Sequence, residues 1–307
     1  MIRTATLAAL SLVSSPLLAQ AAWSLTYPPV LPPTRNAALT AFHDGTNTMI
    51  TMFGAGVGGA LYDAWQLQVD VWSPMPGTLP PRRDNAVIVS DTVRDRLVVF
   101  GGGTSSGMQD IWEWDGTSWA NPNPAVKPPG RFRHAAAFDP LRGVMVVFGG
   151  AGAVLQDTWE WDGTSWHQAT PATAPAARYG AVMAFDPHNG GVLLHGGTTG
   201  NQFLNDTWTF DGTAWLQHQP STPPPYRLRA SMVTDVDRGR VVLLGGQTSD
   251  PFTWEWDGSQ WSPIYQPSPA PLYGFGMVYD TAERRIIVHG GAVNLLGFTL
   301  QTNDTWN

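Results

Sequence analysis

The sequence predicts an all-β protein built from repeated four-stranded antiparallel sheets, and three observations support this fold class. First, its 307 residues include 33 glycines and 26 prolines, which would interrupt long helices throughout the chain. Second, apolar segments that end in glycine recur every 45 to 49 residues. Third, tryptophans recur at nearly the same interval. A period of this length indicates one structural unit repeated along the chain.

Three ladders of residues mark the repeat. The first consists of residues that precede a glycine: Phe53, Phe100, Phe148, His195, Leu244 and His289. The second consists of Trp72, Trp119, Trp166, Trp215 and Trp261. The third consists of Trp65, Trp112, Trp159, Trp208, Trp254 and Trp306. Because the ladders keep one phase, we expect every interval to fold in the same way.

The first half of each unit predicts two strands, as the third unit illustrates. Residues 134–138 are small and apolar, and a turn follows them at 139–143. Residues 144–148 are rich in valine, which favours a buried strand, and they end in Gly149-Gly150. A variable loop then leads to the second half of the unit.

The second half predicts two further strands. Residues 157–161 alternate between polar and aromatic side chains, as in a half-buried strand. Asp162-Gly163 predicts a tight hairpin turn in which the glycine has a positive φ. Residues 165–167 form the last strand, and a proline-rich connector starts the next unit. The same Asp-Gly pair recurs at 115–116, 211–212 and 257–258.

Four antiparallel strands repeated at this period are typical of a β-propeller blade. Residues 23–27 resemble an outer strand that has no unit of its own, whereas the unit from Tyr273 onward lacks an outer strand. We therefore predict a six-bladed propeller whose ring is closed by the N-terminal strand, which removes an exposed sheet edge. A chain that continued past Asn307 could add a seventh blade, and this alternative stays open.

The N-terminal segment predicts a signal peptide over residues 1–21. Arg3 provides a positive start, an apolar run follows from Ala5 to Ala19, and small residues at Ala19 and Ala21 suit cleavage near Ala21. We therefore expect a secreted or periplasmic protein whose residues 22–307 form a single propeller. The predicted boundaries are 22–33 for the closing strand and about 35–81, 82–129, 130–176, 177–225, 226–270 and 271–307 for the blades.

The composition excludes several classes of protein. An aromatic content of 11% argues against disorder, and the absence of cysteine excludes disulfide scaffolds and cysteine nucleophiles. The net charge is −7 with a single lysine, Lys127, so we expect no nucleic-acid partner. After the N-terminal segment no apolar run is long enough to span a membrane. We expect a monomer without a cofactor. We also expect no metal, because the histidines show no ligand spacing.

The repeat resembles the kelch family. The double glycine after an apolar strand, the aromatic strand that follows it and the spaced tryptophans match the kelch pattern over essentially the whole of residues 22–307. This resemblance implies a β-propeller, but kelch propellers include binding modules, scaffolds and some enzymes. Galactose oxidase is similar in fold, yet that resemblance implies copper and a cysteine-linked tyrosine, which this chain cannot form.

Arginines at the start of each predicted first strand are the main candidates for ligand binding. They are Arg35, Arg83, Arg131, Arg178 and Arg227, with Leu272 in the sixth position. Beside them, the repeat is broken by Arg133, His134, Tyr179, Tyr226, Arg229 and Tyr273. Variable loops share this end of the blades, which favours a binding face for an anionic group. In the alternative interpretation, the arginines pair with Asp63, Asp110, Asp157, Asp206 and Asp304 in a lattice that ties the blades together.

Other residue types predict structure rather than chemistry. We expect the tryptophans to fill the outer parts of the blades, and His195 and His289 to be hydrogen-bonded core residues. Glu113, Glu160 and Glu255 occupy one repeated strand position, where we expect them to face solvent. No catalytic residue can be nominated from these patterns.

Two functions from different classes fit these observations. The first is a secreted binding protein that recognises a protein or glycan through one face of the propeller. The second is an extracellular enzyme similar to kelch sugar epimerases such as the sialic acid mutarotases, which would need a free arginine and a nearby acid or base. A structural surface-layer component cannot be separated from the first function.

Overall fold

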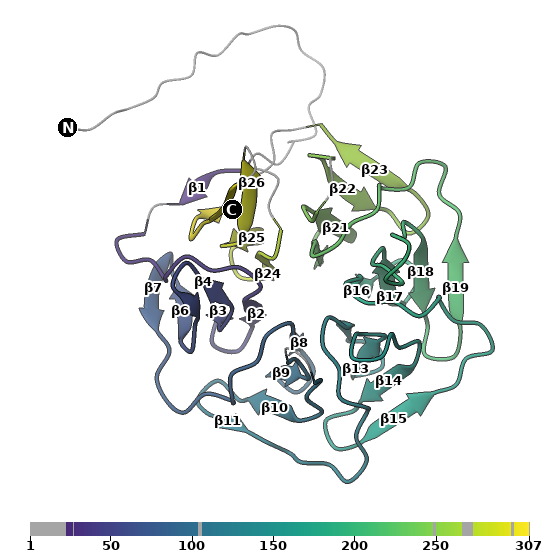
Figure 1. Cartoon of the computed structure of the whole chain (residues 1–307), viewed down its shortest axis with the longest axis horizontal. Coiled ribbons are helices and arrows are strands. Elements are labelled where there is room, and N and C mark those ends of the chain that lie inside the picture. The colour runs from purple at the N-terminus through teal and green to yellow at the C-terminus, as the bar shows by residue number, and fades with distance from the viewer. Residues whose placement is uncertain are drawn as a thin grey trace, which may run out of the picture.

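The computed structural model describes residues 23–26, 28–103, 106–247, 250–265, 273–295 and 298–306. These residues form six four-stranded antiparallel sheets around a central axis (Figure 1). The predicted all-β fold, a six-bladed propeller, is confirmed. In the described ranges there is no helix, and so none that could cross a membrane. The predicted signal peptide and Leu272 lie outside the described residues.

The strands occupy four concentric positions in the ring. The innermost strands are β2 (Leu39–His43), β8 (Val87–Asp91), β12 (Ala135–Asp139), β16 (Val182–Asp186), β20 (Ser231–Asp235) and β24 (Gly276–Asp280). The second strands are β3 (Thr48–Met52), β9 (Arg96–Phe100), β13 (Val144–Phe148), β17 (Gly191–His195), β21 (Arg240–Leu244) and β25 (Arg285–His289). The third strands are β6 (Ala64–Gln68), β10 (Ile111–Trp114), β14 (Thr158–Trp161), β18 (Thr207–Phe210), β22 (Thr253–Trp256) and β28 (Thr305–Trp306). The outer strands are β7 (Val71–Pro74), β11 (Trp119–Ala120), β15 (Trp166–Ala169), β19 (Trp215–His218), β23 (Trp261–Ile264) and β1 (Leu25–Thr26).

The N-terminal strand closes the ring. β1 pairs with β28 through Leu25 opposite Trp306, and β28 pairs in turn with β25. The sixth blade therefore takes its outer strand from one end of the chain and its third strand from the other (Figure 1). This confirms the predicted closure by the N-terminal strand.

The first blade departs from the predicted ladder by one residue. β3 ends at Met52, which pairs with Leu39 as Phe100 pairs with Val87 in the second blade. Phe53 then occupies the place of Gly101, with a φ of 59° against 67° for the glycine. The predicted equivalence of Phe53 with Phe100 is therefore wrong. The buried side chain of Phe53 packs in the core, which offsets the cost of a left-handed backbone at a non-glycine residue.

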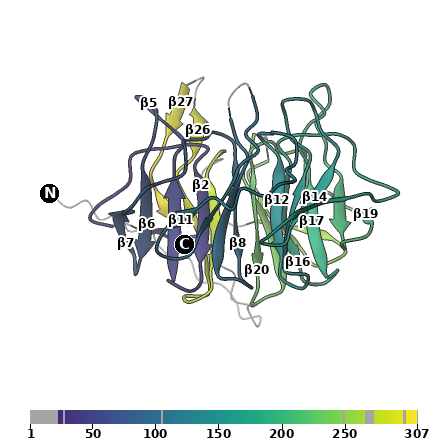
Figure 2. The same ribbon diagram turned by 90° about the horizontal axis from the view of Figure 1, so that it is seen from below.

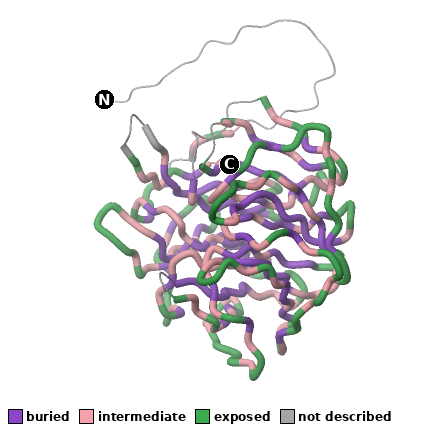
Figure 3. The backbone as a smooth tube through the Cα atoms, turned by 45° about the vertical axis from the view of Figure 1, so that its right-hand side comes forward, coloured by how far each residue is buried: buried purple, intermediate pink, exposed green. Residues whose placement is uncertain are grey.

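The hydrophobic core lies between the blades rather than at the axis. One cluster joins Val98 and Phe100 of the second blade to Val147 and Trp161 of the third. The tryptophans fill this space as expected, and none of the 15, all of which are described, is exposed. Figure 3 shows buried residues along the strands and exposed residues at the turns and loops.

Outer-strand tryptophans also hydrogen-bond across the blade boundaries. Trp215 Nε1 donates to Thr158 Oγ1 of the preceding blade at 3.0 Å, and Trp261 donates to Thr207 in the same way. In the second blade, Ile111 stands where the third blade has Thr158. The buried Nε1 of Trp166 accordingly has no partner among the described residues.

The loops that follow the second strands gather at one end of the propeller, which we call the loop face. Two of these loops form hairpins, β4 (Ala55–Gly56) with β5 (Gly59–Ala60) and β26 (Ala292–Leu295) with β27 (Phe298–Gln301). Figure 2 shows β5, β26 and β27 projecting from the same end. The inner strands begin at this end, so the residues just before them belong to the loop face.

Candidate functional site

The five predicted arginines before the inner strands, which we call the ring arginines, are almost wholly buried. Arg35, Arg83, Arg131, Arg178 and Arg227 are each 2% exposed or less. Each forms an ion pair with an aspartate just before the third strand of its own blade. The partners are Asp63, Asp110, Asp157, Asp206 and Asp250.

The third blade shows how a ring arginine is held. Both terminal nitrogens of Arg131 donate to the carboxylate of Asp157 at 2.8 Å, and one also donates to the carbonyl of Gly149. Asp157 accepts a further hydrogen bond from Trp159 Nε1 at 2.7 Å. Burial alone would raise the pKa of Asp157, but the hydrogen bond and charge of Arg131 outweigh it and lower that pKa. This is the geometry of a structural ion pair, in which four of the five N–H groups of Arg131 donate within the protein.

At the ring arginines, the link between neighbouring blades is made by main chain. The carbonyl of Arg178 accepts a hydrogen bond from Gly150 of the preceding blade, and that of Arg131 accepts one from Gly102. The expectation that the Arg–Asp pairs themselves tie the blades together is therefore wrong, because each pair lies within one blade. The side chain of each ring arginine stabilises its own blade, and the carbonyls of four of the five (Arg35, Arg131, Arg178 and Arg227) also accept a hydrogen bond from the preceding blade.

The fifth and sixth blades depart from the predicted aspartate series. In the fifth blade the partner of Arg227 is Asp250, four residues before Trp254 instead of two, so spacing alone does not identify it. Asp304 of the sixth blade, where Leu272 replaces the arginine, has an exposed side chain.

Two residues after each ring position, the backbone has a positive φ in every blade. The residues are Ala37, Asn85, Arg133, Gly180, Arg229 and Gly274, and their φ angles lie between 53° and 68°. Arg133 N–H donates to the carbonyl of Asn85, and Gly180 N–H donates to that of Arg133. We call this set the mouth ring, because all six line the same end of a central channel.

Arg133 and Arg229 are the two cations of the mouth ring. Neither forms an ion pair or a side-chain hydrogen bond within the described part of the chain, and the Nε of Arg133 is buried without a partner there. Burial lowers the pKa of Arg229, and the positive charge of Arg133 lowers it further. Two guanidinium groups that repel each other and have no carboxylate partner among the described residues are suited to binding an anion.

The other predicted residues that break the repeat have different surroundings. His134 is buried, and burial followed by the charge of Arg131 keeps its pKa well below the ordinary value, so its ring is neutral. Tyr273 is also buried, and its hydroxyl donates to Thr299 at 3.5 Å. Tyr179 is half-buried and pairs through its backbone with Thr198. Only Tyr226 of this group is exposed.

An aromatic pair on the loop face joins Tyr226, which was predicted as a candidate, to Phe203, which was not. Phe203 stacks on Tyr226 with ring centroids 4.7 Å apart, and the two side chains are 52% and 43% exposed. A second pair has Arg82 over the ring of Tyr62 at 4.9 Å, with Tyr62 68% exposed. Phe203 and Tyr62 lie in or beside variable loops, where no repeated position marks them. We call these four residues the rim aromatics and their arginine, or simply the rim.

The opposite end of the blades carries a second set of ion pairs. Arg94 contacts Asp91 at 2.7 Å and Glu113 at 2.9 Å, and Arg142 and Arg238 bind Glu160 and Glu255 in the same way. These glutamates are half-buried and paired, so the expectation that they simply face solvent is wrong.

The histidines of the ladder are core residues, as expected. His195 Nδ1 lies 3.1 Å from Thr207 Oγ1, and His289 makes the same contact with Thr305. Burial lowers the pKa of both rings to about 3. In the described ranges, no three His, Asp or Glu side chains are grouped as a metal site would require.

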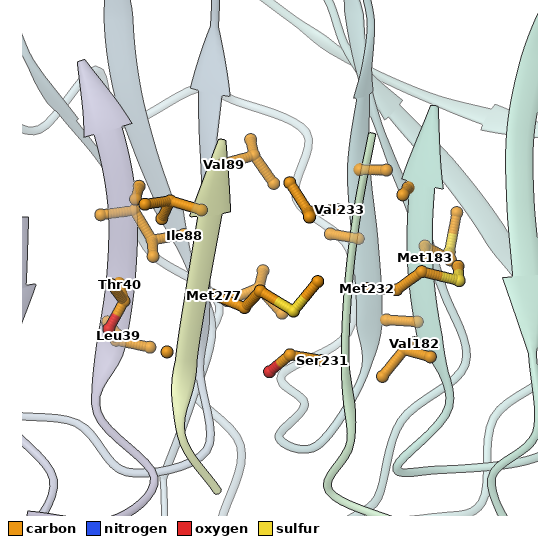
Figure 4. A pocket seen from close by; sticks show the side chains of 18 of the residues that line it. Leu39, Thr40, Ile88, Val89, Val182, Met183, Ser231, Met232, Val233 and Met277 are labelled. Carbon is orange, nitrogen blue, oxygen red and sulfur yellow. The ribbon is translucent and has the colours of Figure 1, made fainter. Parts of the chain in front are cut away.

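The central channel has a volume of about 490 Å³ and is enclosed by the six inner strands (Figure 4). Apolar side chains such as Ile88, Val182 and Met277 form most of its wall. Two of its hydroxyl groups donate to main-chain carbonyls: that of Ser231 to Phe275 at 2.9 Å, and that of Thr234 to Phe185. The channel therefore presents an apolar wall with cations at its loop-face mouth.

Comparison with known families agrees with the architecture. Residues 115–261 match the family model described as the KLHDC2/KLHL20/DRC7 Kelch-repeats domain. These residues run from the hairpin turn of the second blade to the outer strand of the fifth. The remaining blades repeat the same four-stranded pattern. No curated protein matches the chain significantly.

Proposed function

Because the chain belongs to the kelch-repeat β-propeller family, we propose that it is a secreted interaction protein whose loop face binds a protein partner. Kelch propellers commonly mediate protein interactions. Secretion is supported by the signal-peptide pattern of residues 1–21. The loop face is favoured as the binding surface because variable loops on a rigid frame provide specificity without changing the fold.

The observation that carries this proposal is the exposure of the rim. Large aromatic side chains and arginine are the residue types enriched at the centres of protein interfaces. Tyr226 and Phe203 already fix each other by stacking, so little side-chain entropy is lost when a partner covers them. The mouth-ring cations Arg133 and Arg229 add positive charge to the same face, which favours an acidic partner surface.

The enzyme alternative has no comparable support. An epimerase would need a free arginine with an acid or base beside it, and all five ring arginines are paired with aspartate. Arg133 and Arg229 are not so paired, but among the described residues no Asp or Glu contacts either of them. His134, which is buried close to Arg131, is held neutral in the core.

Site-specific photocrosslinking tests the proposed surface. A benzophenone amino acid replaces Phe203 in one variant and Leu216 in the control, since Leu216 is similarly exposed but lies on the outer strand β19. We expect one defined protein adduct from position 203 in the native host, and its loss when Tyr226→Ala is added. Equal adducts from both positions, or none from position 203, would contradict the proposal. A glycan array probed in parallel identifies the case in which the partner is a sugar.

A further inference from the structure

The channel and its mouth differ in character from the rim, and together they define a second binding site. Met183, Met232 and Met277 stand at one repeated position of the fourth, fifth and sixth blades, five residues after the ring position. All three line the channel (Figure 4). Methionine adapts its shape to apolar ligands and is favoured at surfaces that accept flexible molecules. One half of the channel wall is therefore apolar and lined by side chains that can adapt their conformation.

The mostly apolar wall of the channel disfavours a sugar. A sugar needs hydrogen-bond donors and acceptors along its length. The hydroxyl groups of Ser231 and Thr234 already donate to main-chain carbonyls. Thr40 Oγ1 lies 3.3 Å from Thr51 Oγ1 and is likewise engaged. An alkyl chain needs no hydrogen bonds in such surroundings, and its transfer out of water is favourable.

The charges at the two mouths set the direction of the ligand. The loop-face mouth carries Arg133 and Arg229, which have no carboxylate partner in the described ranges. The opposite mouth carries Asp44, whose carboxylate accepts a hydrogen bond from Thr281 at 2.7 Å. An anionic head group is thus attracted to the first mouth and repelled from the second.

We propose that the channel binds a linear alkyl chain that ends in a carboxylate. The carboxylate lies between Arg133 and Arg229, and the chain runs along the three methionines. Each inner strand has five residues and is about 17 Å long, which matches an extended chain of about a dozen carbons. This site is separate from the rim and is tested without any protein partner.

Calorimetry of the purified propeller with dodecanoate, below its micelle-forming concentration, is the direct test. We expect saturable binding with one molecule per chain, much weaker binding of butanoate and dodecanol, and none of dodecyltrimethylammonium. Butanoate binding as tight as dodecanoate would reduce the site to an anion site and overturn the proposal. Absence of saturable dodecanoate binding would also overturn it.

Two pairs of variants locate the ligand, with residues that the repeat itself tolerates. Arg133→Asn/Arg229→Asn keeps a side chain that accepts positive φ, as Asn85 does in the second blade, and should weaken dodecanoate binding about tenfold or more. The charge-matched control is Arg96→Asn/Arg240→Asn, at the starts of β9 and β21 and away from this mouth. An equal effect of both pairs would show that the anion is held only by net charge, contrary to the proposal.

Ala136→Met places in the third blade the methionine that three other blades carry at that position, and narrows the channel. We expect this variant to bind a shorter acid, octanoate, better than dodecanoate. In the unaltered protein, methionine methyl NMR should show shifts at Met183, Met232 and Met277 on binding. Shifts confined to methionines elsewhere, or unchanged chain-length preference in a folded Ala136→Met variant, would place the ligand outside the channel.

Discussion

Arg131 and Arg133 are two residues apart in the same connector, yet they have opposite environments. Arg131 is fully buried, donates to both oxygens of Asp157 and is repeated in five blades. Arg133 has a left-handed backbone, lines the channel mouth and has no carboxylate partner among the described residues. Its counterparts in the other blades are Ala37, Asn85, Gly180, Arg229 and Gly274, so only the fifth blade repeats the arginine.

The difference shows how to separate structure from function in a repeat protein. A residue that recurs in every blade meets a recurring partner, because each blade packs in the same surroundings. A residue that breaks the repeat has no such partner built into the neighbouring strands. Arg133 and Arg229 therefore keep their charge available, whereas the more regular ring arginines do not.

The largest expected effect is the loss of a ring arginine. Arg131→Ala leaves the half-buried carboxylate of Asp157 and the carbonyl of Gly149 without their donors, so we expect the free energy of unfolding to fall by about 3–5 kcal/mol. Arg133→Asn should change it by less than about 0.5 kcal/mol. Urea denaturation measures the free energy of unfolding of both variants. Similar losses for the two would show that Arg131 and Arg133 do not differ in their contribution to stability.

The next largest effect should be a loss of stability at low pH, where the aspartates paired with the ring arginines become protonated. Hydrogen bonds and charge from the paired arginines outweigh burial and lower the pKa of Asp110, Asp157 and Asp206. A carboxylate with a lowered folded-state pKa adds stability above its unfolded value, about 3.9, and this is lost as pH falls through the folded value. We expect the difference in unfolding free energy between the native protein and Asp157→Asn to be constant above about pH 5 and to shrink below pH 4. A difference that does not change with pH would contradict this assignment.

Backbone conformation at the mouth ring should give a smaller effect. Arg133→Val places a β-branched residue at a φ of 53°, whereas Arg133→Asn retains a residue type that tolerates it. We expect the valine variant to be about 1–2 kcal/mol less stable than the asparagine variant. Equal melting temperatures would show that the left-handed turn relaxes in solution.

The smallest effect concerns the bonds between blades. Thr158→Val keeps the shape of the side chain but leaves Trp215 Nε1 without its acceptor, as Ile111 already does for Trp166. We expect a loss of about 1 kcal/mol by denaturation. Thr170→Val, at an exposed position, is the control and should be neutral. A neutral Thr158→Val would mean that this bond adds nothing to the apolar contact.

Much of the fold could be predicted because its signals are local and repeated. Asp162-Gly163 sets a hairpin turn, and Gly163 has the expected positive φ of 92°. The unmatched outer strand near Trp23 correctly indicated closure of the ring. The shift at Phe53 could not be predicted, because a phenylalanine in a left-handed conformation is tolerated only once the core around it has formed.

The candidate site was predicted less completely. The sequence alone determined which residues follow the repeat and which break it, since both depend only on spacing. The tertiary structure decided which of the eleven candidates retain free charge or exposed surface, because burial and ion pairing depend on side chains that lie about 20 to 30 residues apart and meet only in the folded blade. It also brought Phe203 against Tyr226 and placed Arg133 and Arg229 at one mouth of an apolar channel, contacts that no local pattern contains.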